Sequence, residues 1–351
     1  MQASAVARIS LVVIAVVTAG AALHWAAAIF TPLVLAVFLL ILVDGFARAL
    51  QRHAPWLPEW ADLPLALVIT LAAMALALVG VLNNAASFGQ QLVTDAPKLN
   101  LMIGKLAAQL GVPAPPALQQ VIQQVNPARY VGDIAGALQT IGSGAVYVFI
   151  YLGFLLASRQ GFSTKAAGVW PDPDIRRRAV AVLARIRDGV QRYLWIQTVS
   201  GSMIALSAFA LMLAVGLEHA DFWAFLIFIL VFIPVIGGLV AGVLPPLFAL
   251  IQYNDIWPAV IVFVGLQVIL FAIGTILLPR MQRDGLNIDP VVVLLSLAIW
   301  GSIWGIPGMF LSTPLTVMAI VILAQFPGAR WIAVLLSGDG EPWSGAQADD
   351  A

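Results

Sequence analysis

Very few side chains in this sequence could carry out acid–base, nucleophilic or metal chemistry, and those few form no motif. The chain has no cysteine and only three scattered histidines, which excludes thiolate ligands and cysteine nucleophiles. No Gly-x-Ser-x-Gly sequence stands beside a usable histidine, and paired aspartates are missing from the apolar blocks. The carboxylates considered lie at block ends, where solvated anchors are usual: Asp44, Glu218, Asp221, Asp255 and Asp289. We therefore predict no enzyme activity, no metal site and no cofactor.

The remaining candidates are uncharged groups that suit contact with a solute or an ion. Prolines and glycines inside apolar segments free backbone carbonyls, and helix N-termini can face an anionic or hydroxyl-rich solute. Nearby hydroxyl and amide side chains could add contacts, although such groups also bond back to their own helix or join neighbouring helices. The predicted path comprises Pro234, Gly237, Gly238, Gln267, Thr275, Ser302, Pro307, Gly308, Ser312, Thr313 and Pro314. Asp289 is the candidate proton or cation site, but its place before Pro290 also indicates a helix N-cap.

The elements that must position these groups are membrane helices. Hydrophobic residues make up 62% of the 351 residues and charged residues only 10%, too few charges for a water-soluble surface. Zero net charge argues against a basic nucleic-acid binder. Apolar blocks approach or exceed the roughly 20 residues that one helical crossing needs. They are 9–43, 63–86, 136–157, 200–217, 222–251, 256–278 and 291–324. We predict an all-α, polytopic integral membrane protein.

The pattern of blocks divides the chain into six segments. The first, with an uncleaved first span, contains two short helices in 9–43 and a third span. Basic residues place 159–192 and both termini in the cytoplasm. The predicted helix there, starting at Asp172 and Asp174, lies on lipid headgroups or binds a partner. The segments are 1–86 (three spans), 87–135 (extracytoplasmic amphipathic cap), 136–158 (fourth span), 159–197 (cytoplasmic basic amphipathic helix), 198–326 (transport core) and 327–351 (cytoplasmic tail).

The last blocks contain helix-breaking residues. Block 222–251 is interrupted at 234–238 and at Pro245–Pro246, and block 291–324 at 301–308 and at Pro314. Proline removes a backbone donor, so a break exposed to lipid would leave polar groups unsatisfied. We therefore expect both breaks to lie inside protein or beside a cavity.

Each broken block is either one kinked span or a re-entrant hairpin. Two hairpins would place Arg280 and Arg283 in the cytoplasm, whereas two kinked spans would place them outside. The positive-inside rule therefore favours the hairpins.

Four stretches, taken in order, resemble the autoinducer-2 exporter family of bacterial membrane proteins, whose members are described as exporters or cation–proton antiporters. They are Phe232–Gly238, Leu278–Pro290 and Trp300–Met309, with Ser312–Leu315 following. The resemblance implies a multi-pass protein of the bacterial cytoplasmic (inner) membrane with about eight hydrophobic segments. It also implies a homo-oligomer, expected to be a pentamer, and a moving transport unit. Thr275 departs from the family, which often carries asparagine there.

Three functions follow from these residues and this resemblance. The favoured one is export of a small polar signalling molecule or metabolite, such as autoinducer-2 in quorum sensing, through a site at the broken helices. Sodium–proton antiport is the alternative, but it would usually need a membrane carboxylate. A membrane scaffold without transport is the third. The expected partners are the lipid bilayer, a small solute and further copies of the chain, with no nucleic acid.

Overall fold

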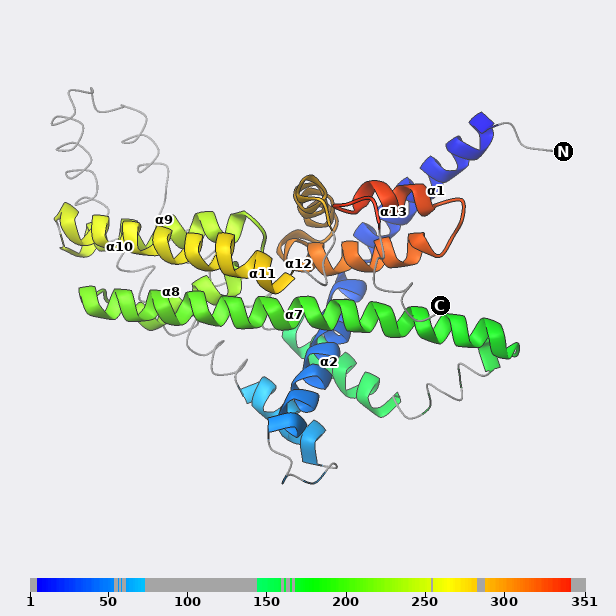
Figure 1. The fold of residues 1–351 in the computed structure, drawn as a ribbon, viewed down its shortest axis with the longest axis horizontal. Coiled ribbons are helices and arrows are strands. Elements are labelled where there is room, and N and C mark those ends of the chain that lie inside the picture. The colour runs from blue at the N-terminus through cyan, green and yellow to red at the C-terminus, as the bar shows by residue number, and fades with distance from the viewer. Residues whose placement is uncertain are drawn as a thin grey trace. The chain divides into compact units, whose positions relative to one another are not determined.

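Regular structure in the described part of the chain is helical throughout. The computed structural model describes residues 5–53, 56, 58, 61–72, 144–158, 161, 165, 168–253, 255–282 and 288–341. The predicted cap at 87–135 lies outside these residues, as do residues 342–351 of the predicted tail. No strand occurs in the described ranges, which confirms the all-α fold class (Figure 1).

The chain forms two compact units that are each assembled from separated stretches. Unit 1 comprises Met1–Phe46, Gly144–Trp195 and Arg283–Ala351, and unit 2 comprises Ala47–Ser143 and Ile196–Gln282. Two long helices, α2 and α7, begin in unit 1 and end in unit 2. The six-segment division, which follows chain order, stays a prediction.

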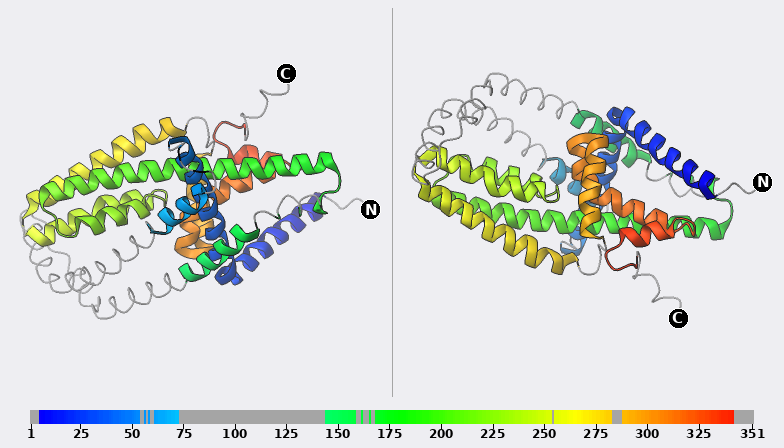
Figure 2. Two further views of the ribbon diagram at one scale, coloured as in Figure 1. Left: turned by 90° about the horizontal axis from the view of Figure 1, so that it is seen from below. Right: turned by 90° about the horizontal axis from the view of Figure 1, so that it is seen from above.

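The first apolar block forms two helices, as predicted. α1 spans Ala5–Trp25 and α2 spans Ala27–His53, with only Ala26 between them. At 21 and 27 residues neither helix is short, so that part of the prediction is wrong. The chain changes direction at this joint (Figure 2), where the Ala26 amide still donates to the Ala22 carbonyl at 2.9 Å.

The basic segment begins one long helix, α7, which spans Pro173–Val215 without interruption. Asp172 Oδ1 accepts from the backbone amides of Asp174 and Ile175, at 2.8 and 3.4 Å, so the acidic pair starts the helix as predicted. At 43 residues α7 is about 65 Å long, roughly twice the thickness of the hydrocarbon core. One crossing therefore uses only part of it.

Unit 2 contains a helical hairpin followed by a longer apolar helix. The elements are α8 (Ala220–Leu230), α9 (Ile236–Tyr253), α10 (Ile256–Leu270), the π-helix η2 (Phe271–Leu277) and α11 (Leu278–Gln282). α8 packs against α9, and α9 packs against α10. With 11 residues α8 is about 16 Å long, too short to cross the hydrocarbon alone.

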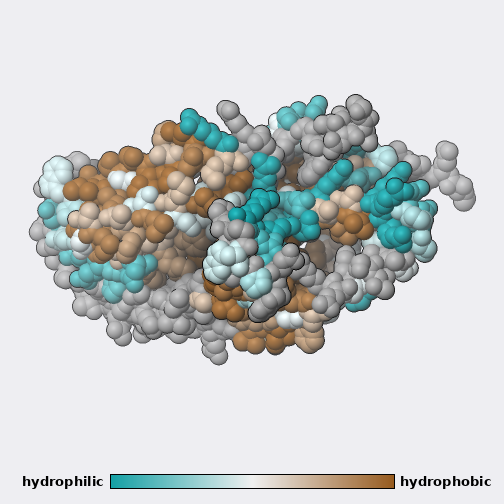
Figure 3. All heavy atoms as spheres, turned by 60° about the horizontal axis from the view of Figure 1, so that its bottom comes forward, coloured by the Kyte–Doolittle hydropathy of each residue, from teal (hydrophilic) through white to brown (hydrophobic). Residues whose placement is uncertain are grey.

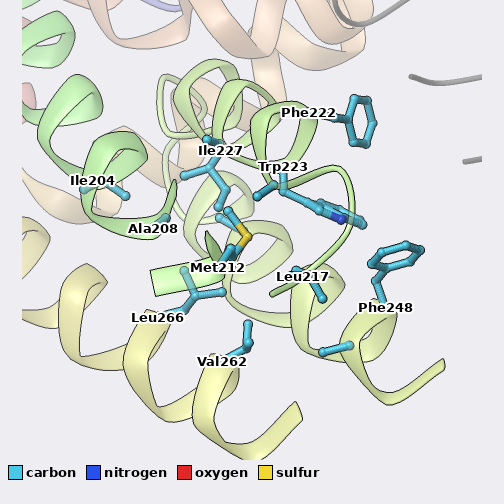
Figure 4. Packing of buried hydrophobic residues seen from close by; sticks show 14 of the residues in the cluster. Ile204, Ala208, Met212, Leu217, Phe222, Trp223, Ile227, Phe248, Val262 and Leu266 are labelled. Carbon is cyan, nitrogen blue, oxygen red and sulfur yellow. The ribbon is translucent and has the colours of Figure 1, made fainter. Parts of the chain in front are cut away.

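The core of unit 2 lies where the C-terminal part of α7 meets these helices. Met212 of α7 lies among side chains of α8 and α10, including Ile227 and Leu266 (Figure 4). Trp223 and Phe248 close one end of the cluster, with ring centroids 5.7 Å apart. This packing holds the short helix α8 against its neighbours.

Unit 1 contains the second broken block, which forms α12 (Pro290–Ala324), followed by α13 (Arg330–Leu336). Gly305 has φ 65° and ψ −141°, and it divides α12 into two limbs that point in different directions (Figure 2). The second limb packs against α7 through Leu311, Leu315, Ile186 and Val190. This contact with α7 therefore fixes the position of the second limb of α12.

Among the described residues, four helices are long and apolar enough to cross a membrane. They are Ala27–Arg52 within α2, α7, Ile256–Leu277 and α12. Apolar side chains also gather at the surface over α10 and η2 (Figure 3), where Val268 and Phe271 are exposed. Leu239 of α9 is exposed as well. These features support a multi-pass membrane protein, while the number of eight segments and the two re-entrant hairpins stay predictions.

Two predicted interruptions are wrong. Pro245 and Pro246 lie inside α9, and Pro314 lies inside α12. Pro245 and Pro314 are fully buried. A proline costs a helix one hydrogen bond and a steric clash, and close packing on all sides can keep the helix continuous in spite of both.

Candidate solute path

The break between α8 and α9 lies at Pro234, as predicted. Proline has no amide hydrogen, so the Leu230 carbonyl loses the donor that a continuous helix would give it. It accepts instead from the Ile233 amide at 2.8 Å. Val235 has a φ of 63°, a left-handed conformation that is unusual for a β-branched residue and ends the helical path.

A side chain from α7 satisfies the next carbonyl of this break. Gln197 Nε2 donates to the Val231 carbonyl at 2.6 Å, and Gln197 is only 6% exposed. One turn further along α7, Gly201 lies close to Phe228, because a β-carbon there would be 3.4 Å from the ring. α7 and α8 thus pack closely at this point, and the glutamine reaches the tip of the hairpin.

The two glycines after Pro234 have different surroundings. A β-carbon on Gly237 would overlap the backbone carbonyl of Leu230, whereas one on Gly238 would meet nothing within 4 Å. Gly237 is buried and Gly238 half-buried. Gly237 is thus required by the close approach of α8 and α9, and Gly238 is available to line a path.

Gln267 of α10 and Thr275 of η2, which were predicted to line the solute path, are both exposed. Gln267 packs its amide against α9, so that a β-carbon on Gly242 would lie 2.7 Å from Nε2. Thr275 lies in η2, a π-helical segment. π-Helical segments are rare and often occur at functional sites.

The break in α12 lies at Gly305, just before the predicted Pro307 and Gly308. The two limbs approach closely on either side of it, because a β-carbon on Gly308 would overlap the Trp300 carbonyl. Trp300 Nε1 also donates to Thr316 Oγ1 at 3.3 Å, joining the limbs. The second break is therefore a bend whose two limbs pack against each other.

The end of α1 meets this bend through two hydrogen bonds. His24 Nδ1 lies 2.8 Å from the Ile303 carbonyl oxygen. Trp304 Nε1 donates to the Leu23 carbonyl at 3.1 Å. Because Pro307 cannot donate to Ile303, the histidine replaces the missing helical donor. The freed backbone groups at both breaks thus have partners within the protein. The backbone itself is not enclosed, because Val235 is 65% and Ile306 is 72% exposed, so the prediction that the breaks lie inside protein is confirmed only for these bonds.

The hydroxyl groups of α12 differ in their bonding. Ser302 is exposed and Ser312 is buried, and each donates to its own helix, to Ile299 and Met309, at 2.8 Å. Thr316 donates to the Ser312 carbonyl at 2.8 Å. The hydroxyl protons of Ser302 and Ser312 are therefore bonded within their own helix, which is the alternative to a solute contact given for them above.

Thr313 differs from these three residues. It is 7% exposed, and its Oγ1 completes no hydrogen bond of ordinary length and angle with the described residues. The Tyr193 hydroxyl of α7 interacts with it more loosely. Buried hydroxyls are normally paired, so this oxygen can take a further partner.

Asp289 caps α12. Its Oδ1 accepts from the Val291 amide at 2.7 Å, and its own amide donates to the Leu336 carbonyl at 3.3 Å. Capping alone accounts for an aspartate at this position. A proton or cation role for Asp289 stays a prediction.

One buried carboxylate was missed. Asp62 is 2% exposed and lies at the second position of the helix Ala61–Ala72. Its Oδ2 accepts from Gln51 Nε2, and its Oδ1 has no partner among the described residues. An aspartate beside a proline-rich linker gives no sign in the sequence that it will be buried. In the described ranges no three acidic or histidine side chains could hold a metal ion.

The predicted path residues divide between the two units. Pro234, Gly237, Gly238, Gln267 and Thr275 lie in unit 2, and the others lie in unit 1. Three residues that hold the breaks were not predicted: Gln197, His24 and Trp304. Tyr193, which lies beside Thr313, was not predicted either. The His24–Trp25 pair and the tyrosine at the end of the basic helix were visible, but no spacing connects them to α12.

Comparison with known proteins gives one family. Residues 11–328 match the AI-2E family transporter description. The AI-2 transport protein TqsA of Escherichia coli strain K12 is 27% identical over 323 residues, which cover 90% of this chain and 91% of TqsA. YhhT of the same strain, also named as a transport protein, is 30% identical over 333 residues, 92% of each chain. A transport protein of Haemophilus influenzae is 26% identical over 345 residues, covering 95% of this chain and 97% of its own.

Proposed function

Because this chain belongs to the AI-2E family of transporters, we propose that it exports a small polar signalling molecule or metabolite similar to autoinducer-2. The coarser function, that of a multi-pass membrane transporter, follows from the family. Transport of AI-2 is part of the name of TqsA, which is 27% identical to this chain. The proposed setting is the bacterial inner membrane with both termini in the cytoplasm, and the proposed assembly is a homo-oligomer.

The observation that carries the proposal is the Thr313 hydroxyl. It is buried beside Tyr193 on the limb that follows the Gly305 break, and it completes no ordinary hydrogen bond with the described residues. A neutral solute with several hydroxyl groups can both donate to and accept from such a group without bringing a charge into the protein. The exposed Gln267 and Thr275 are proposed as solute contacts of unit 2.

Transport of autoinducer-2 into inverted vesicles tests this proposal. Thr313→Val keeps the shape of the side chain and removes the hydroxyl, so we expect the KM to rise by up to about tenfold. Thr313→Ser should retain most of the affinity. The control is Ser337→Ala, which removes another buried hydroxyl that bonds to its own helix, at Val334. Unchanged kinetics in Thr313→Val would exclude this contact.

The same vesicles distinguish the alternatives. If no variant and no wild-type protein moves autoinducer-2 or related metabolites, the export proposal fails. Sodium-dependent proton flux that Asp62→Asn or Asp289→Asn abolishes would support antiport in its place. Absence of every flux would favour a scaffold.

A further inference from the structure

Two helix discontinuities of unit 1 are joined by a reciprocal pair of hydrogen bonds. One is the α1–α2 joint at Ala26, and the other is the α12 break at Gly305. His24, two residues before the joint, bonds to the Ile303 carbonyl, two residues before the break. Trp304 bonds in the opposite direction, to the Leu23 carbonyl. Residues about 280 positions apart thus meet at both discontinuities at once.

Each bond supplies a donor where the helix lacks one. The Ile303 carbonyl would accept from residue 307 in a continuous helix, and that residue is a proline. The Leu23 carbonyl lies in the last turn of α1, where carbonyls have no intrahelical donor. A carbonyl oxygen only accepts, so His24 must carry its proton on Nδ1.

Separating the two discontinuities would leave two carbonyls and two ring donors without these partners. Each lost bond has a cost, and the cost falls on both elements together. Movement of the α12 break relative to the joint therefore has to break the bonds or carry the joint along.

We infer that His24 and Trp304 are positioning residues that couple the α1–α2 joint to the α12 break, so that the two move as one hinge during transport. The link to transport rests on the proposed function. The coupling itself is a property of unit 1 and can be measured without any solute.

Cysteine reporters can measure the coupling because the native chain has no cysteine. Ile306, 72% exposed, follows the break, and Trp25, 88% exposed, precedes the joint. Ile306→Cys and Trp25→Cys are made separately in the full chain and reconstituted in liposomes. The rate of modification by a maleimide is then compared with and without the substitutions at residue 24 or 304.

We expect His24→Leu to raise the labelling rate at both reporters by about threefold or more, as for loss of one membrane hydrogen bond of average strength. Trp304→Phe should do the same. His24→Asn places an amide donor close to the position of Nδ1 and should restore the wild-type rate. Val17→Leu, an exposed substitution on the same helix, serves as the control.

Two results would overturn the inference. One is an unchanged labelling rate at both reporters in His24→Leu, and the other is His24→Asn behaving like His24→Leu. In transport assays with autoinducer-2, His24→Leu should change the maximal rate and leave the KM near its native value, unlike Thr313→Val. If no autoinducer-2 transport occurs at all, the proposed function fails while the labelling results still test the hinge.

Discussion

Gln197 of α7 donates its side-chain amide to the backbone carbonyl of Val231, 2.6 Å away, at the tip of the α8–α9 hairpin. The bond joins residues 34 positions apart and places a buried polar group where proline and a left-handed valine have ended the helix. An apolar membrane segment can keep an irregular turn only when its freed backbone groups find partners. Gln197 is such a partner.

Gln197→Met should destabilise the protein, because it removes the donor at nearly constant volume and leaves the Val231 carbonyl unsatisfied. We expect a loss of about 1 to 3 kcal/mol in the free energy of unfolding. Unfolding in detergent measures it. Gln267→Met, at an exposed amide of the same unit, should change it much less, and equal losses for the two variants would contradict the role of the bond.

Gly237→Ala and Gly238→Ala should differ sharply although the residues are adjacent. The first puts a β-carbon into the Leu230 carbonyl, so α8 and α9 must separate, at a cost of about 1 to 3 kcal/mol or more. The second meets nothing and should be neutral or stabilising by up to about 1 kcal/mol. Thermal unfolding of both variants provides the comparison, and similar midpoints would show that the hairpin turn is looser than described.

Gly305→Ala should oppose the bend in α12. The φ of 65° with ψ of −141° is a conformation that side chains rarely adopt, and we expect a cost of about 1 to 3 kcal/mol. No neighbouring atom lies within 4 Å of the added methyl, so the cost is one of backbone conformation. Gly20→Ala in α1, with open space and a helical backbone, is the matched control. A Gly305→Ala protein as stable as wild type would place the bend elsewhere.

Asp289 can be tested as a cap against its predicted titrating role. Asparagine is also a good N-cap, so Asp289→Asn should preserve stability, whereas Asp289→Ala should lose about 0.5 to 2 kcal/mol. If the carboxylate serves only as a cap, Asp289→Asn also transports normally. Loss of transport in a stable Asp289→Asn variant would restore the ion-site interpretation.

The positions of the helix breaks could be predicted from the sequence only in part. Pro234 and the Gly305–Gly308 region could be predicted because proline and glycine act on the backbone within one turn. The same rule was wrong at Pro245 and Pro314, since those residues are buried and the packing around them keeps their helices continuous. Whether a proline ends a helix depends on neighbours that the rule does not include.

The sequence by itself determined that the chain is helical and membrane-spanning, because apolar length and scarce charge are properties of composition and order along the chain. Its stretches around Pro234 and Pro307 were enough to indicate the transporter family. Only the tertiary structure decided three things. It decided which donors hold the breaks, that among the described residues Thr313 completes no ordinary hydrogen bond whereas Ser312 bonds to its own helix, and that Asp62 is buried. Those facts depend on contacts between residues far apart in sequence, such as Gln197 with Val231, and no local spacing encodes them.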